Sequence, residues 1–340
     1  MFPLGNISRL LNASNQDGAP PCQIITVVTH RASSAAADLL SAGDYAIAYP
    51  ESTIFYQGVR QSLVDPVTVE YGSALTDSLR ISNDQSAMAL ARKTEWRFMF
   101  RFVTLQAEFP GVRQSLANPA LTNLDCLLHL LSTKLSARAA KLLARAQERH
   151  KRYNDLLDKC LAKAFKARRS LMRAPLPPAK LQAEVLHKII DFEVSSHKKD
   201  TAWTFGGGLS RLNEDFFLLQ EYLVSTHGSQ FQNLCQRWGP YVLTIEEKTE
   251  LIATSDDGAR NEAMLDKVRP HFQPLWSFFV ALCHALQESE ENYLTPRDAF
   301  WLGLIDEVIG EDLPSQRLIA EFRPDPQPIP IQAPAQPPPA

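Results

Sequence analysis

The feature that most constrains the fold is the segment 26–57, where short strand-like runs flank a helix-like stretch. A β-branched apolar run at 23–29 ends in a cluster of small residues. The alanine-rich stretch that follows predicts a helix over 34–43, closed by a glycine. Strand signals follow at 46–49 and 53–56, so the pattern predicts a β-α-β unit in an α/β core.

The bend before this helix places small residues beside Ser34, where the backbone can approach a reacting carbonyl group closely. The amides at a helix start can also hold a negatively charged oxygen. A serine at a helix start is, however, also a common N-cap. The residue type alone therefore leaves both a nucleophile and a structural cap open.

The sequences HRASSAAA at 30–37 and LLSAG at 39–43 resemble the nucleophile region of the Clp protease proteolytic subunit. That family consists of serine peptidases with the crotonase-like fold. The resemblance implies that Ser34 is the nucleophile and that amides near Ala35 help to hold the oxyanion. The family's glycine-rich oxyanion strand lies upstream of the serine, and we expect it to fall before the first residue of this chain.

Two further segments carry the resemblance. The residues at 50–57, PESTIFYQ, resemble the next strand of the family, which ends in the catalytic histidine, and that position holds Gln57. The residues NYLTPRDA at 292–299 and LGLIDEVI at 302–309 resemble the family's closing motif. The catalytic aspartate of that motif corresponds to Glu291. We expect the glycine at 303 to turn the chain from a helix into the last strand.

The resemblance leaves two functions open, because the amide of Gln57 cannot take a proton from a serine at neutral pH. The first is a serine peptidase that cleaves peptide bonds in an oligomeric chamber, with Glu291 orienting the base. A rebuilt set of Ser34, His284 and Glu291 would supply that base. The second is a non-catalytic relative that binds partners through its helical region.

The resemblance also implies a peptide or protein substrate, a homo-oligomer and an unfoldase partner. A net charge of −3 gives no field that would attract nucleic acid, so we do not expect that partner. The sequence has no apolar run of the ~18 residues that span a membrane. The five cysteines lack metal-ligand spacing and predict reduced thiols in a cytoplasmic protein, without metal or cofactor.

Residues 61–285 read mainly as helices, so we divide the chain into four parts. The peptidase-like core comprises 1–60 and 286–322, the helical insertion 61–285, and an extended proline-rich tail 323–340. In the family a shorter helical handle in the place of the insertion joins stacked rings. Helical periodicity predicts helices at 86–107, 123–172, 180–195, 209–225, 245–253, 258–268 and 270–290.

The insertion contains two unusual patterns. Residues 134–173 hold thirteen Lys or Arg against three acidic residues, which predicts an amphipathic helix or hairpin with a basic face. That face is simply solvated, docks to an acidic partner or to nucleic acid, or lies on a membrane surface. The sequence GVRQSL occurs at 58–63 and again at 111–116. We interpret it as a shared glycine turn before a helix, or as a duplicated contact element.

Overall fold

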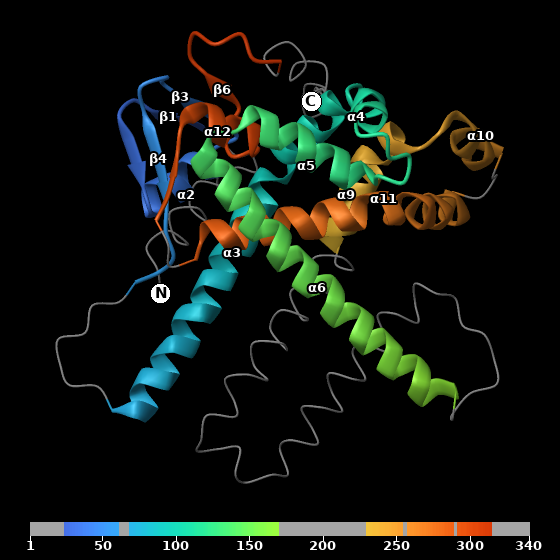
Figure 1. Ribbon diagram of the computed structural model, residues 1–340, viewed down its shortest axis with the longest axis horizontal. Helices are drawn as coiled ribbons and strands as arrows, with labels where there is room; N and C mark the ends of the chain where they lie inside the picture. Colours follow the sequence, from blue (N-terminus) through green and yellow to red (C-terminus); the bar gives the residue numbers. More distant parts are fainter. Residues whose placement is uncertain (1–23, 61–67, 170–228, 254–256, 289–290, 315–340) are drawn as a thin grey trace, which may run out of the picture.

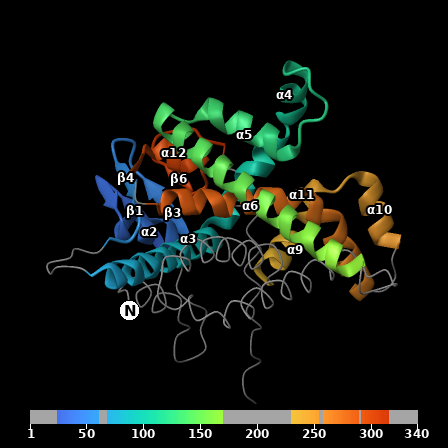
Figure 2. The same cartoon turned by 60° about the horizontal axis from the view of Figure 1, so that its bottom comes forward.

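The computed structural model describes residues 24–60, 68–169, 229–253, 257–288 and 291–314. Two small sheets lie at one end of a helical body (Figures 1 and 2). The strands are β1 (Ile25–Val28), β2 (Arg31–Ser33), β3 (Tyr45–Ala48), β4 (Thr53–Tyr56), β5 (Asn292–Leu294) and β6 (Glu307–Val308). The described part is thus a mixed α/β structure, which agrees with the predicted class.

The first sheet is parallel and has the strand order β1-β3-β6. Helix α2 (Ala35–Ala42) crosses from β2 to β3 and contacts strands of both sheets. The register pairs Val28 with Ala48 and Ala48 with Val308, and all three side chains are buried. The predicted β-α-β unit is therefore present. The third strand of this parallel sheet, β6, comes from the far end of the chain.

The second sheet has the order β2-β4-β5, with β2 parallel and β5 antiparallel to β4. The rings of Phe55 and Tyr293, which face each other in the register, stack at 4.5 Å. Helix α12 (Pro296–Trp301) follows β5, and Gly303 then takes a φ of +76°. A Cβ at that glycine would lie 2.7 Å from the backbone of Phe98, so the predicted glycine turn is confirmed.

The helical body fills most of the described region between β4 and β5. Its helices are α3 (Val69–Gln106), α4 (Phe109–Ser115), α5 (Asn123–Lys134), α6 (Ala137–Arg169), α9 (Ser229–Val242), α10 (Ile245–Ala253) and α11 (Asp257–Leu286). The helix predicted at 245–253 is confirmed, whereas α4, α9 and the first half of α3 were not predicted. The helices predicted at 180–195 and 209–225, and the tail at 323–340, lie outside the described residues.

The single helix predicted over 123–172 is wrong, because the chain breaks between α5 and α6. Leu135 leaves the helix with an extended backbone. Ser136 then donates from its amide and its hydroxyl to the two carboxylate oxygens of Asp298, each at 2.8 Å. A contact with α12, far along the sequence, therefore sets this break.

The helix break predicted between residues 268 and 270 is also wrong, because α11 continues through Pro270 and Pro274. A proline inside a helix costs about 3 kcal/mol. The rest of α11 carries fully buried aromatic side chains such as Phe272 and Trp276, which pack in the core. Burying one such side chain stabilises the fold by roughly 1.5–3 kcal/mol, so several together outweigh the cost.

Helix α3 ties the helical body to the first sheet. The guanidinium of Arg97 donates to Asp306 Oδ2 at 2.7 Å and to the carbonyls of Ser41 and Gly43 at 2.7 and 2.6 Å. Arg97 and Asp306 are both buried, so they form a buried, fully hydrogen-bonded ion pair. Buried side chains of the sheets and helices also form one continuous cluster. The predicted domain limits stay a prediction.

The described residues of the two GVRQSL segments differ in structure. Gly58–Arg60 form neither helix nor strand, and a Cβ on Gly58 would lie 2.5 Å from the carbonyl oxygen of Gln287. Gly111 lies inside α4, where a Cβ would meet nothing within 4 Å. The described residues of the two copies therefore do not share one turn geometry.

No helix in the described part is long and apolar enough to span a membrane.

Candidate functional site

Ser34 joins β2 to α2 and has an unusual backbone conformation. Its φ is 54° and its ψ is −119°, so it lies on the positive-φ side that glycine favours. The amide of Ser34 donates to the carbonyl of Phe55 at 2.7 Å, which holds the turn against β4. A strained non-glycine backbone of this kind costs about 1–3 kcal/mol and persists only where the surrounding structure enforces it.

The hydroxyl of Ser34 does not cap the helix that it precedes. The carbonyl of Ser34 accepts from the amides of Ala37 and Asp38, which starts α2 in the usual way. Among the described residues, the amides of Ala35 and Ala36 have no backbone acceptor, and both residues are exposed. The predicted oxyanion position at Ala35 thus has an open donor at a helix start.

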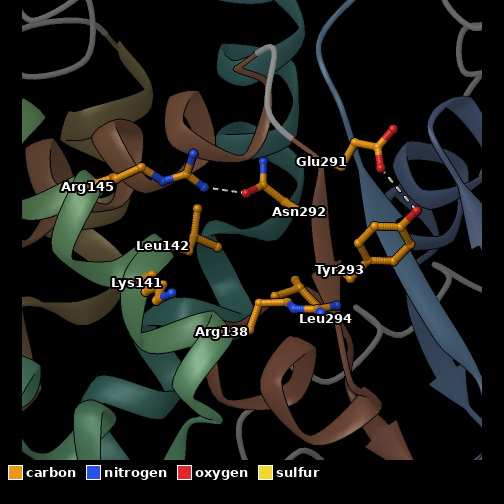
Figure 3. Close-up of a pocket in the computed structure, with 8 residues that line it drawn as sticks. All are labelled: Arg138, Lys141, Leu142, Arg145, Glu291, Asn292, Tyr293 and Leu294. Carbon is orange, nitrogen blue, oxygen red and sulfur yellow. Dashed lines mark hydrogen bonds between the residues drawn. The ribbon is translucent and has the colours of Figure 1, made fainter.

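The strand register brings the other two predicted site residues to the same end of the second sheet. Tyr56 pairs with Asn292 at the end of the ladder, so Gln57 and Glu291 are the residues next to this last pair. The pairing of Ser33 with Phe55 places Ser34 at this end too. In Figure 3 the carboxylate of Glu291 points towards the Tyr293 hydroxyl, which donates to it at 3.2 Å.

These three residues share one end of the sheet, but their side chains are not connected. No hydrogen bond of the described chain joins Ser34, Gln57 and Glu291. Glu291 instead lies 3.6 Å from Arg60, and each side chain is 51% exposed. An exposed pair of this kind contributes about 0–1 kcal/mol, so Arg60 does not hold Glu291 firmly.

The rebuilt set with His284 does not form in the structure. The Nδ1 atom of His284 lies 3.2 Å from Asp84 Oδ1 on α3 and 3.4 Å from a guanidinium nitrogen of Arg149 on α6. His284 is therefore engaged inside the helical body, while Glu291 contacts Arg60 and Tyr293.

Asp38 is a residue of this region that the sequence reasoning did not single out. It lies one helical turn after Ser34, and its Oδ1 accepts from the side-chain amide of Gln287 at 2.8 Å. Burial raises the pKa of Asp38 to about 6, and the hydrogen bond from Gln287 partly opposes this rise. An acid in the first turn of a helix was the available signal, but its partner at the end of α11 was not predictable.

Among the described residues, no three or more His, Cys, Asp or Glu side chains form a group that could hold a metal ion. Cys126, Cys235 and Cys283 are buried free thiols. Burial raises the pKa of Cys235 to about 12, so this thiol is not an activated nucleophile.

Comparisons with family models, with curated proteins and with solved structures found no match to this chain.

Proposed function

We propose that this protein is a homologue of the Clp protease proteolytic subunit, with Ser34 at the position of a serine nucleophile. The observation that carries the proposal is the backbone of Ser34, which has a positive φ between a strand and a helix. Serine nucleophiles of other hydrolases also stand on strained strand-to-helix turns that expose the hydroxyl. A simple N-cap needs no such strain.

In this proposal the hydroxyl of Ser34 attacks a peptide carbonyl, and the open amide of Ala35 helps to hold the oxyanion that forms. Gln57 stands where the base would be, and an amide cannot remove the proton of the hydroxyl. Loss of a triad histidine costs a factor of about 10⁴–10⁶ in turnover. Any cleavage of peptide bonds is therefore slow, whereas activated electrophiles still acylate Ser34.

The reaction with a fluorophosphonate probe tests this proposal, because the probe carries its own activated leaving group. We expect slow labelling that Ser34→Ala abolishes. Ser33→Ala is the matched control, because Ser33 is the neighbouring serine and its hydroxyl accepts a hydrogen bond from Arg31 Nε at 2.7 Å. Labelling that is absent, or that survives in Ser34→Ala, would contradict a nucleophilic Ser34.

A second candidate is a non-catalytic relative that retains the fold and binds partners through its helical insertion. Gln57 favours it, together with the absence of a hydrogen bond between Glu291 and either Ser34 or Gln57. Both candidates assume a cytoplasmic homo-oligomer that handles peptides or proteins, with or without an unfoldase. Light scattering tests the shared assumption, because a strict monomer would argue against a ring.

A further inference from the structure

Arg31 on β2 precedes the turn at Ser34, and its guanidinium group is held beside that turn. The Nε atom of Arg31 donates to the hydroxyl of Ser33 at 2.7 Å. The guanidinium carbon also lies 5.9 Å from the centre of the Phe55 ring. Phe55 is buried and stacks on Tyr293, so the ring that carries the guanidinium is itself fixed.

Phe55 also connects this guanidinium to Ser34. Its ring contacts Arg31, and its carbonyl accepts from the amide of Ser34 at 2.7 Å. Ser33, which accepts from Arg31, is the residue directly before Ser34, and consecutive Cα atoms lie about 3.8 Å apart. A long side chain of a peptide bound at Ser34 can therefore reach the guanidinium of Arg31.

The positive charge of Arg31 is not neutralised by the described chain. Arg31 is exposed, and its contacts are with a hydroxyl and an aromatic ring, which are both uncharged. No carboxylate of the described residues forms an ion pair with it. The contact with Ser33 uses only the Nε donor, so the Nη1 and Nη2 atoms can donate to the oxygens of a ligand carboxylate.

We infer that Arg31 determines specificity at the candidate site by binding the side-chain carboxylate of an acidic residue in the peptide that reacts with Ser34. The acidic residue carries the attacked carbonyl or lies just before it. This inference rests on the proposed function and adds the chemical class of its substrate, a peptide with Asp or Glu at the attacked bond.

The chemistry of a guanidinium suits this role. Arginine holds carboxylates through charge-assisted hydrogen bonds, and its planar fork can bind both oxygens at once. The contacts with Ser33 and Phe55 orient the group before a ligand arrives, which lowers the entropy lost on binding.

Labelling of the full chain with peptide-derived fluorophosphonates tests the inference. In each tripeptide probe a phosphorus atom replaces the attacked carbonyl carbon. The Ser34 oxygen bonds to phosphorus, fluoride leaves, and water takes the hydroxyl proton. A single glutamate occupies each position in turn, and the matched reference probe has glutamine there. We expect the best glutamate probe to label Ser34 about fivefold faster than its reference, and this preference to decline at high ionic strength.

Arg31→Met should abolish the preference, because methionine can still cover Phe55 but has no charge. Arg31→Lys should retain part of it, since lysine keeps the charge without the fork. Arg237→Met is the matched control and should leave the preference unchanged. Arg237 on α9 is also exposed and lies over an aromatic ring, with its guanidinium carbon 5.6 Å from the centre of Trp96.

The ratio of the two labelling rates separates this inference from the proposed function, because a general loss of folding or reactivity lowers both rates alike. Equal labelling by the glutamate and glutamine probes would overturn the role of Arg31 and leave Ser34 as the nucleophile. A preference that survives in Arg31→Met, or that Arg237→Met also abolishes, would overturn it too. If an uncharged alkyl fluorophosphonate also fails to label Ser34, the proposed function is wrong and the inference falls with it.

Discussion

Two helix starts in this core, at Ser34 and Thr295, use similar residues in opposite ways. Thr295 has an extended backbone and a capping box: its hydroxyl accepts from the amide of Asp298 at 3.1 Å, and Asp298 Oδ2 accepts from the amide of Thr295 at 3.2 Å. Ser34 has a positive φ and no side-chain cap. Thr295 therefore follows the usual chemistry of a helix N-terminus, and Ser34 departs from it.

The acidic residues in the first turns of α12 and α2, Asp298 and Asp38, also differ in how their carboxylates are used. Asp298 accepts from Thr295, which caps α12, and from Ser136, which links α12 to the chain just before α6. Asp38 is desolvated and has a hydrogen bond from Gln287. The start of α12 is thus built for stability. The start of α2 combines strain, open amides and a poorly solvated acid, which are typical costs of a functional site.

Gln57→His gives the largest expected effect and tests whether the Ser34 turn is a lapsed nucleophile site. A histidine at position 57, at the same end of the sheet as Glu291, would supply the missing base, and general-base catalysis is worth about 10²–10⁴-fold. We expect the rate of fluorophosphonate labelling to rise by about 10²-fold, since Glu291 is not yet held in place.

Two controls accompany this variant. Gln57→Ala should not accelerate labelling, and Ser34→Ala should abolish the gain in the double variant. An unchanged labelling rate in Gln57→His would contradict a lapsed nucleophile site at Ser34. The helix starts at Ser34 and Thr295 would then differ in backbone strain only, and not in function.

Asp38→Asn gives the next largest effect, on stability. Because the pKa of Asp38 is raised from 3.8 to about 6 in the folded chain, the folded state binds the extra proton between these values. The free energy of unfolding therefore falls as the pH rises from about 4 to 6, and it remains at this lower value above pH 6. The full shift corresponds to about 3 kcal/mol, and partial exposure reduces this to about 1–2 kcal/mol.

An asparagine keeps an oxygen for Gln287 and has no charge to desolvate. We expect Asp38→Asn to be the more stable protein by about 1–2 kcal/mol at pH 7 and equal to the parent at pH 4. Urea denaturation at several pH values measures this difference. Asp298→Asn should instead destabilise at pH 7, since it weakens the cap and the bonds to Ser136. The same sign for both variants at pH 7 would contradict the comparison.

Thr295→Ala should cost about 1–2 kcal/mol of unfolding free energy, because the capping box loses its hydroxyl. Ser34→Ala should cost less than about 0.5 kcal/mol, since no cap hydrogen bond is lost. Both values come from chemical denaturation at one pH. If Ser34→Ala instead lowers the unfolding free energy by as much as Thr295→Ala, about 1–2 kcal/mol, the hydroxyl of Ser34 is structural.

The sequence predicted local elements well where their signals were local. The strand 53–56 and the helix 245–253 are confirmed at their bounds, and the helix 34–43 is confirmed within one residue at each end. The three-residue strands β2 and β5 were too short for a periodic signal. The continuity of α11 through two prolines depends on the burial of its aromatic side chains, which a local pattern does not contain.

The sequence indicated which residues to consider at the candidate site, but not the backbone conformation or the contacts of those residues. The resemblance placed Ser34, Gln57 and Glu291, and the strand register sets them at one end of a sheet. The positive φ of Ser34 had no sequence signal, because serine is not glycine and the hydrogen bond to Phe55 enforces the turn. The environment of Asp38 likewise depends on Gln287, which is distant in sequence.

Ser34→Gly gives the smallest expected effect and measures the strain directly. A glycine at φ 54° relieves about 1–3 kcal/mol of strain, while its freedom in the unfolded chain costs about 0.5–1 kcal/mol. We expect a net gain in stability of about 0.5 kcal/mol. Ser33→Gly, one residue earlier inside β2, should lose about 0.5–1 kcal/mol because its backbone is not strained. If both glycines destabilise equally, the turn at Ser34 stores no strain, and the contrast with Thr295 reduces to the missing cap.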